Sequence, residues 1–333
     1  MPIQITIIGL GQIGSSIGLA LAGKKDLVWR MGHDKEPARV RNAEKLGAVD
    51  KTHFNLPASV RDADIVVLAL PFNAIRETLE FIGQDLKEGT VVMDTAAVKG
   101  PVFEWARQYI PQGRYYVGLI PALNPACLHE AKAGIEGARA DLFTKGVFGV
   151  VAPPGTPGEA VKLAADLSYL LGAEPMFTEL GEADSLMASL HLLPQLVSTA
   201  LIGMTIDQPG WLEGRKLASR AFALSTGVLF FQDTVAGLRD AALADRENTL
   251  RVLDGLTSAL NDIRDEIAAQ DANRLGARIE QAIDGRALWW SVREKGDWYG
   301  AELGKPNAGM PSPGEYMRQL FLGKFGSREQ KKK

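Results

Sequence analysis

Residues 5–14 read Ile-Thr-Ile-Ile-Gly-Leu-Gly-Gln-Ile-Gly, an apolar run that leads directly into the spacing Gly9-x-Gly11-x-x-Gly14. The β-branched residues before the glycines favour a strand, and the Ala- and Leu-rich residues 15–23 are compatible with a helix. In such a unit, the first glycine allows a tight turn, the second lets the backbone approach a pyrophosphate, and the third lets the helix pack on the strand. The N–H groups and dipole of the helix N-terminus attract phosphates. The stretch therefore predicts a dinucleotide-binding turn.

Residues near this turn are the expected contacts of the dinucleotide. Gln12 and Ile13 lie between the second and third glycines and complete the phosphate-binding turn. Asp34 follows a plausible second strand over 27–33 and stands where an acid accepts hydrogen bonds from the ribose hydroxyls. Its charge would repel a 2′-phosphate and so favours NAD, whereas the neighbouring Lys35 keeps NADP as an alternative.

Strands and helices alternate through the first half of the chain. Residues 64–70 form a continuous apolar run, typical of a parallel strand buried on both faces, and Pro71 ends it. Further strands are expected at 90–94, 115–118 and 146–152. This alternation predicts a doubly wound, Rossmann-type parallel sheet. Ligands bind beyond the carboxyl ends of such strands, so Leu70, Pro71 and Asp94 are expected to contact the cofactor.

The second half of the chain has a different pattern. Beyond Gly181, apolar residues recur at three- and four-residue spacing, which predicts helix after helix. Residues 183–206 are apolar on most faces and are expected to be buried. So much apolar helical surface favours a homodimer. The expected segments are a dinucleotide-binding domain (1–152), a connecting helix and short strand (153–180), an all-helical substrate and dimerisation domain (181–304) and a partly flexible extension (305–333).

Composition excludes several classes of protein. The chain has 333 residues, of which 46% are hydrophobic and 23% charged, as in ordinary globular proteins. A net charge of −3 argues against a nucleic-acid partner. A single cysteine, Cys127, excludes a disulfide framework and fits a reducing cytoplasm, and no histidine–carboxylate spacing indicates a metal site. No uninterrupted apolar segment reaches about 18 residues, so no membrane span is expected.

Together these segments resemble the prephenate and arogenate dehydrogenases of tyrosine biosynthesis, over about residues 4–290. The resemblance is carried by 9–16, 34, 47–50, 64–71, 94–99, 117–121, 183–184 and 193–194. It implies NAD(P)-dependent oxidative decarboxylation of a cyclohexadienol, in which a hydride leaves the carbon that bears the hydroxyl. It also implies a histidine that accepts the hydroxyl proton, a serine that holds this histidine, and an arginine and a second histidine at the substrate. Histidine suits this reaction because a base with a pKa near neutrality can accept the proton of an alcohol. Arginine suits it because its guanidinium group can form two parallel hydrogen bonds to a substrate carboxylate.

The sequence departs from the family at these positions. Ala97 stands at the serine position, Ile120 at the position of the first histidine and Gln195 at that of the second, and the arginine has no clear match. Ala97, Ile120 and Gln195 are expected to line the substrate pocket. With Leu229 at the position that an ungapped alignment gives the arginine, a pocket lined by Ala97, Ile120 and Leu229 would be more apolar than the family's. The resemblance implies a divergent member that lacks the catalytic Ser, His and Arg.

Three other residues are candidates for catalysis. His191 lies one helical turn before Gln195 and is an alternative base, or a structural histidine with a local hydrogen bond. Lys99 could bind a carboxylate or polarise a carbonyl, or be a solvated lysine at a helix start. Asn124 could hydrogen-bond the nicotinamide amide or a substrate carbonyl, or be a turn residue before Pro125.

Three functions follow from these observations. The first is an NAD(P)-dependent dehydrogenase of the prephenate/arogenate type with a small-molecule substrate. The second is a dehydrogenase or reductase for a less charged hydroxy or imino acid. The third is a non-catalytic, dimeric NAD-binding module, because the nucleotide motif persists while the acid–base residues are missing.

Overall fold

The computed structural model describes residues 2–130, 132–231, 234–296 and 298. The chain forms two compact units, Met1–Gln281 and Ala282–Lys333. The first unit contains the whole sheet and the helices that precede the last one. In the second unit, the Arg286 guanidinium lies 4.6 Å from the centre of the Trp289 ring, a cation–π contact within one helix.

One eight-stranded sheet forms the centre of the first unit, with the order β3-β2-β1-β4-β5-β6-β7-β8. Neighbours from β3 through β6 pair in parallel, which confirms the predicted Rossmann-type sheet. Its strands are β1 (Ile3–Ile8), β2 (Val28–His33), β3 (Lys51–Thr52), β4 (Ile65–Leu68), β5 (Val91–Asp94), β6 (Tyr115–Ala122), β7 (Val147–Val151) and β8 (Glu174–Thr178).

The last two strands differ from the predicted all-parallel arrangement. β7 pairs antiparallel with β6 because the two are joined by a loop with short 3-10 turns instead of a crossover helix. β8 then pairs parallel with β7. The expected connecting segment 153–180 therefore contains α6 (Gly158–Leu170) and supplies the eighth strand of the same sheet.

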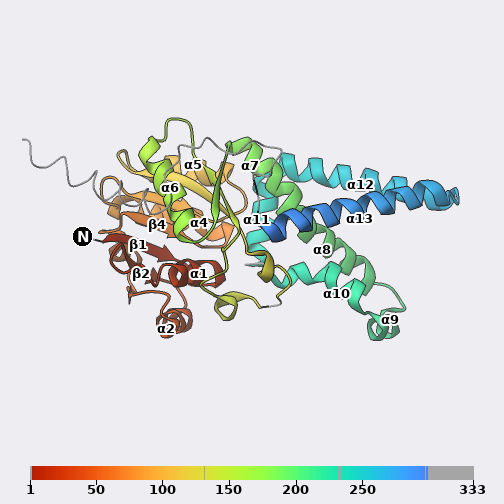
Figure 1. Cartoon of the computed structure of the whole chain (residues 1–333), viewed down its shortest axis with the longest axis horizontal. Helices are drawn as coiled ribbons and strands as arrows, with labels where there is room; N and C mark the ends of the chain where they lie inside the picture. The colour runs from red at the N-terminus through yellow and green to blue at the C-terminus, as the bar shows by residue number, and fades with distance from the viewer. Residues whose placement is uncertain (1, 131, 232–233, 297, 299–333) are drawn as a thin grey trace, which may run out of the picture. The chain divides into compact units, whose positions relative to one another are not determined.

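Helices cover both faces of the sheet (Figure 1). Alternate residues of β4 point to opposite sides, so Ile65 and Val67 join one core cluster and Val66 and Leu68 the other. The first cluster includes residues of α1 and α6, and the second includes residues of α4 and α5. The helices of this part are α1 (Gln12–Ala20), α2 (Pro37–Leu46), α3 (Leu56–Val60), α4 (Phe72–Ile82) and α5 (Gly100–Tyr109).

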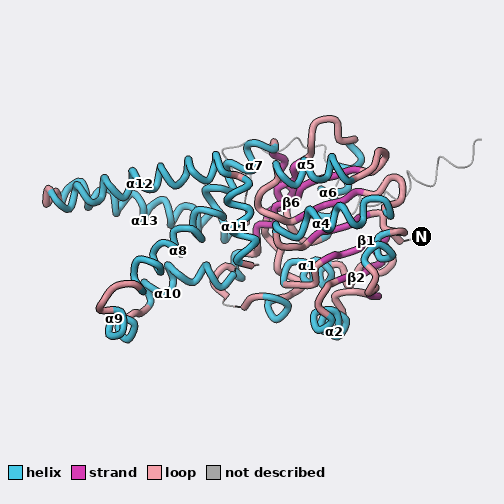
Figure 2. Tube along the Cα trace, turned by 180° about the vertical axis from the view of Figure 1, so that it is seen from behind, coloured by secondary structure: helices cyan, strands magenta, loops and turns pink. Residues whose placement is uncertain are grey.

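From residue 180 onward, every regular element in the described residues is a helix (Figure 2). These are α7 (Leu180–Met187), a π-helical turn (Ala188–Leu192), α8 (Leu193–Ile206), α9 (Trp211–Leu217), α10 (Arg220–Thr226), α11 (Val235–Ala244), α12 (Arg246–Ala268) and α13 (Ala272–Lys295). This confirms the predicted helical second half. The expected extension 305–333 lies outside the described residues.

The segment from α7 to α8 contains a local change of helix type. The π-helical turn Ala188–Leu192 comes directly before Pro194, which lies in the first turn of α8. Proline removes a backbone donor and clashes with the preceding turn of an α-helix, and a wider turn relieves that conflict. His191 lies within this turn.

The expectation that residues 183–206 are buried is wrong for the single chain. Leu180–Ile206 has a mean hydropathy of 1.4 over its most apolar window, of which only 22% is buried. Leu190 is 71% exposed and Met204 is 64% exposed. By length and composition alone, this helix is apolar enough to cross a membrane. Much of its apolar surface is thus left exposed by the part of the chain that the structure describes.

A buried arginine fastens the first part of the sheet. The Arg30 side chain is 2% exposed, and its Nε and Nη2 donate to the two carboxylate oxygens of Asp50 at 3.0 and 2.7 Å. Its Nη1 donates to the carbonyl oxygens of Gly18, Gly47 and Ala48. These bonds connect β2 with the ends of α1 and α2. Hydrogen bonding from Arg30 holds the pKa of Asp50 below its ordinary value.

We expect Asp50→Ala to lower the free energy of unfolding by about 3–5 kcal/mol, because it leaves a buried guanidinium unpaired. Asp85→Ala, which removes the partner of the largely exposed Arg61, should change it by less than about 1 kcal/mol. Urea unfolding at pH 7 measures both. Because the pKa of Asp50 is depressed in the folded state, the difference between Asp50→Ala and wild type should shrink as the pH falls below about 4. Equal losses in the two variants would contradict this account.

Candidate functional site

The three glycines of the opening motif have different structural roles. Gly9 has φ +94°, and a Cβ there would lie 2.3 Å from the carbonyl oxygen of Ala69. A Cβ on Gly14 would lie 1.9 Å from the carbonyl oxygen of Gly9. A Cβ on Gly11 would meet no atom within 4 Å. Gly9 and Gly14 are thus required by the fold, whereas Gly11 leaves open space at the start of α1, where a pyrophosphate can approach the backbone.

Asp34 is fixed beside this turn. One of its carboxylate oxygens accepts a hydrogen bond from the backbone N–H of Leu10, and the other accepts one from Glu36 N–H, both at 2.8 Å. The carboxylate is half-buried, and lone pairs remain for two hydroxyl donors. The neighbouring Lys35 is exposed. The geometry fits the ribose-binding role that the spacing predicts.

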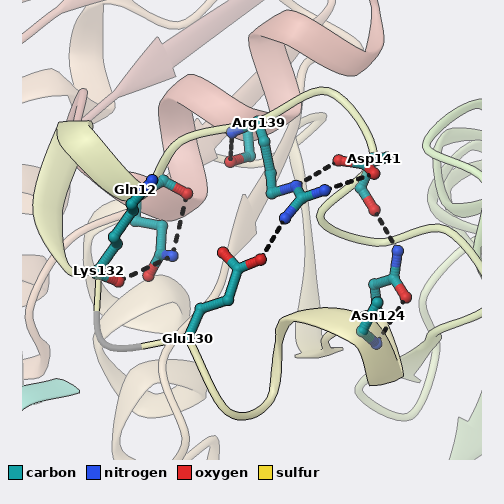
Figure 3. Close-up of polar contacts among 9 residues, drawn as sticks. Gln12, Asn124, Glu130, Lys132, Arg139 and Asp141 are labelled. Atoms are coloured by element: carbon teal, nitrogen blue, oxygen red, sulfur yellow. Dashed lines mark hydrogen bonds and ion pairs between the residues drawn. The ribbon is translucent and has the colours of Figure 1, made fainter.

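The loop after β6 lies against the start of α1 (Figure 3). Gln12 Nε2 donates to the carbonyl oxygen of Gly137 at 3.1 Å, and Ser16 Oγ accepts from the backbone N–H of Arg139 at 3.0 Å. Ile13, by contrast, packs against the core cluster beneath α1. Gln12 therefore links the phosphate-binding turn to a loop more than 100 residues away in sequence.

A charged network stabilises that loop (Figure 3). Arg139 donates to Glu130 Oε1 at 2.7 Å and to both carboxylate oxygens of Asp141, and this bonding raises its pKa while lowering that of Asp141. Asn124 Nδ2 donates to the backbone oxygen of Asp141 at 2.9 Å, and its Oδ1 accepts from Ala126 N–H at 3.0 Å. Both ends of the Asn124 amide thus hold the loop, and its contact with a ligand stays a prediction.

Asp94 and Lys99 form a buried ion pair with no exposed side-chain surface. Lys99 Nζ donates to Asp94 Oδ1 at 2.8 Å, and the Tyr116 hydroxyl donates to Asp94 Oδ2 at 2.6 Å. Burial lowers the pKa of Lys99 and raises that of Tyr116 well above its ordinary value. The expected roles of Asp94 in cofactor contact and of Lys99 in catalysis are therefore not supported, because neither side chain can reach a ligand. Gly118 makes room for Lys99, since a Cβ there would lie 2.8 Å from Lys99 Cδ.

Asp184, which the sequence analysis did not single out as a site residue, joins the helical part to this pair. Its two carboxylate oxygens accept from the backbone N–H groups of Lys99 and Gly100, at 2.6 and 2.8 Å. A residue of α7 thus caps the N-terminus of α5, an arrangement that no local capping pattern in the sequence reveals. Burial raises the pKa of Asp184, although the two backbone hydrogen bonds oppose the shift.

The remaining predicted residues fall into two groups. Leu70, Pro71, Ala97 and Ile120 are half-buried and lie at or just beyond the carboxyl ends of β4, β5 and β6, which form one edge of the sheet. This is where a doubly wound sheet binds ligands. The second group lies in the helical part.

In that second group, Gln195 is buried and its Nε2 donates to the carbonyl oxygen of His191 at 2.9 Å. His191 keeps exposed surface, yet the surrounding protein removes enough of its hydration to lower its pKa below the ordinary value. The lowered pKa favours the neutral form of the imidazole. In the described residues, no group of three His, Cys, Asp or Glu side chains could hold a metal ion.

Comparison with known proteins agrees with this geometry. Residues 17–176 match the family model of the prephenate dehydrogenase nucleotide-binding domain. A cyclohexadienyl dehydrogenase of Zymomonas mobilis is 27% identical over 290 residues, which are 85% of this chain and 94% of that protein. These matches support the prephenate dehydrogenase family for this chain. This confirms the expected family, and with it an NAD-dependent dehydrogenase with a nucleotide-binding first domain.

Solved structures show the same fold. Prephenate dehydrogenase of A. aeolicus, solved with hydroxyphenyl propionate and NAD+, has a TM-score of 0.76 at 22% identity and covers 86% of this chain and 98% of its own. Synechocystis arogenate dehydrogenase has a TM-score of 0.68 at 23% identity and covers 86% of this chain and 100% of its own. The predicted architecture of a Rossmann-type sheet followed by helices is confirmed.

We expect Gly11→Val to abolish NAD binding without unfolding the protein, because the added side chain would occupy the open space that the pyrophosphate needs. Gly158→Val is the matched control, since Gly158 also begins a helix and a Cβ there meets no atom within 4 Å. Calorimetric titration with NAD and a thermal melt measure the two effects. Retained affinity in Gly11→Val would place the pyrophosphate elsewhere.

Proposed function

We propose that this chain catalyses the NAD-dependent oxidative decarboxylation of a cyclohexadienol of the prephenate or arogenate type. The observation that carries this proposal is the open glycine turn with Asp34 fixed beside it, in a chain whose relatives along 85% of its length include a cyclohexadienyl dehydrogenase. In this reaction the substrate carbon that bears the hydroxyl gives a hydride to the nicotinamide. The hydroxyl proton passes to a base, and the ring carboxylate leaves as CO2.

We propose His191 as that base. Its pKa is lowered by burial, so the imidazole is neutral at pH 7 and has a free lone pair for a proton. His191 lies in the π-helical turn of the helical part, and π-turns recur at functional sites. Gln195 fixes this turn by donating to the His191 carbonyl oxygen. Ala97 and Ile120 offer no acid–base group, and Lys99 is buried in its ion pair.

Prephenate or arogenate should therefore reduce NAD+ in the presence of the protein, measured by NADH absorbance. kcat/KM should rise with pH, reach half of its maximum below pH 6.5 and form a plateau above that midpoint. The reason is that the base must be unprotonated and that the pKa of His191 is lowered. His191→Asn should reduce kcat by about 100-fold or more and remove this acid limb. No turnover of either substrate, with NAD binding intact, would exclude the tyrosine-pathway activity and leave another hydroxy acid or a binding module.

We further propose that the chain acts in the cytoplasm as a homodimer joined through its helical part. The support is the apolar surface of the π-helical turn, α8 and α10, where Leu190, Met204 and Leu224, respectively, are each more than 60% exposed. A surface of this kind is expensive to leave in water. Thr199 and Thr205 hydroxyls donate to backbone oxygens of their own helix, so the polar groups of α8 do not oppose its burial.

Leu190→Glu combined with Leu224→Glu should therefore convert a dimer to a monomer, because each change would bury a charge in the contact. Sedimentation equilibrium measures the mass. Phe81→Glu, at an exposed position of α4, is the control and should leave the mass unchanged. A wild-type protein that sediments as a monomer would contradict the proposal.

A further inference from the structure

Phe54 is an aromatic residue whose side chain is exposed to solvent. It lies two residues after the end of β3, and the residue is 94% exposed. An exposed phenylalanine gains nothing from the hydrophobic effect in the free protein. Its surroundings point to a binding role, because they fix its position in detail.

Four hydrogen bonds hold the backbone on both sides of Phe54. His53 N–H donates to the carbonyl oxygen of Gly32 at 3.0 Å, and His33 Nδ1 lies 2.8 Å from the carbonyl oxygen of His53. Because a carbonyl only accepts, His33 must carry its proton on Nδ1. Asn55 N–H donates to His53 Nδ1 at 3.0 Å, and Asn55 Oδ1 caps α3 by accepting from Ala58 N–H at 2.9 Å.

The ring itself rests on the neighbouring imidazole. The Phe54 and His53 ring centres are 5.4 Å apart and their planes differ by 21°, which is a stacked pair. With 94% of the side chain exposed, the remaining ring surface is free to contact another planar group. The backbone bonds and the stacking leave little conformational freedom to lose when that group binds.

The strand register places this aromatic ring near the ribose-binding acid. Met31 pairs with Lys51 and Gly32 with Thr52, so the residues that follow, Asp34 and Phe54, leave adjacent strands at the same edge. Neighbouring strands lie about 4.8 Å apart. From β1 to β2 to β3, the sheet therefore presents the glycine turn, then Asp34, then Phe54. A dinucleotide presents its diphosphate, its ribose and its adenine in the same order.

We propose that the Phe54 ring, supported by His53, stacks on the adenine of the bound NAD. The purine face is apolar and polarisable, and stacking on an aromatic side chain needs no hydrogen-bond partner. The inference rests on NAD as the cofactor and adds a residue from the segment after β3, a strand outside the glycine motif. It concerns the base, so it is independent of the choice between NAD and NADP that Asp34 makes at the ribose.

Calorimetric titration of Phe54→Ala with NAD and with ADP-ribose tests this assignment. Both Kd values should rise by about 5- to 150-fold, the range of base–aromatic stacking. Phe54→Trp keeps a stacking surface and should bind both ligands as tightly as the wild type or more tightly. Phe54→Ala should raise the Kd of nicotinamide cytosine dinucleotide by a smaller factor than the Kd of NAD, because cytosine is smaller than adenine and stacks less.

Phe81→Ala is the matched control, since Phe81 is also exposed, at 63%, but lies on α4 away from this edge. It should leave the Kd for NAD at the wild-type value. The assignment is overturned if Phe54→Ala binds NAD and ADP-ribose like the wild type, or if Phe54→Trp loses as much affinity as Phe54→Ala. NAD binding by the wild-type protein is measured in the same series, so failure of this inference is separable from failure of the proposed cofactor.

Discussion

The close approach of α1 to β1 is the constraint on which the cofactor site depends. At Gly14 the helix lies so near the Gly9 carbonyl that no side chain fits between them, and Gly9 itself turns against Ala69 with a positive φ. This contact directs the first N–H groups of α1 toward the open edge of the sheet. Asp34 is then fixed by the backbone of the same turn, through Leu10. The phosphate and ribose positions are thus parts of one rigid unit.

A second connection joins this unit to the helices. Asp184 on α7 caps α5 by accepting from Lys99 and Gly100, while the Lys99 side chain pairs with Asp94 at the end of β5. Removing one member of such a buried set leaves an unpaired charge or orphaned backbone donors, which is strongly destabilising. These residues therefore join α7, which leads into the π-helical turn, to the start of α5 and the carboxyl end of β5.

The sequence predicted the parts of this structure that depend on local pattern. The glycine spacing, the acid at Asp34 and the buried parallel strands are all properties of short segments, and each is found as expected. Residues whose role depends on tertiary contacts were harder to interpret. The sequence around Lys99 suggests a solvated lysine at a helix start. In the structure its side chain is buried instead, because Gly118 leaves room for it and the Asp94 carboxylate pairs with it. Asp184 caps α5 only because a helix and a loop distant in sequence come together, and the apolar α8 predicts a core helix although much of its surface is exposed in the described residues.

The π-helical turn at Ala188–Leu192 has an evolutionary consequence. Such a turn holds one more residue than an α-helical turn, so a single inserted or deleted codon converts one into the other. Because the wider turn absorbs the additional residue, α7 and α8 keep the faces that they present, whereas an insertion without such a turn would rotate everything downstream by about 100°, one residue step of an α-helix. A one-residue insertion or deletion here can thereby change which side chain occupies the turn without altering either flanking helix.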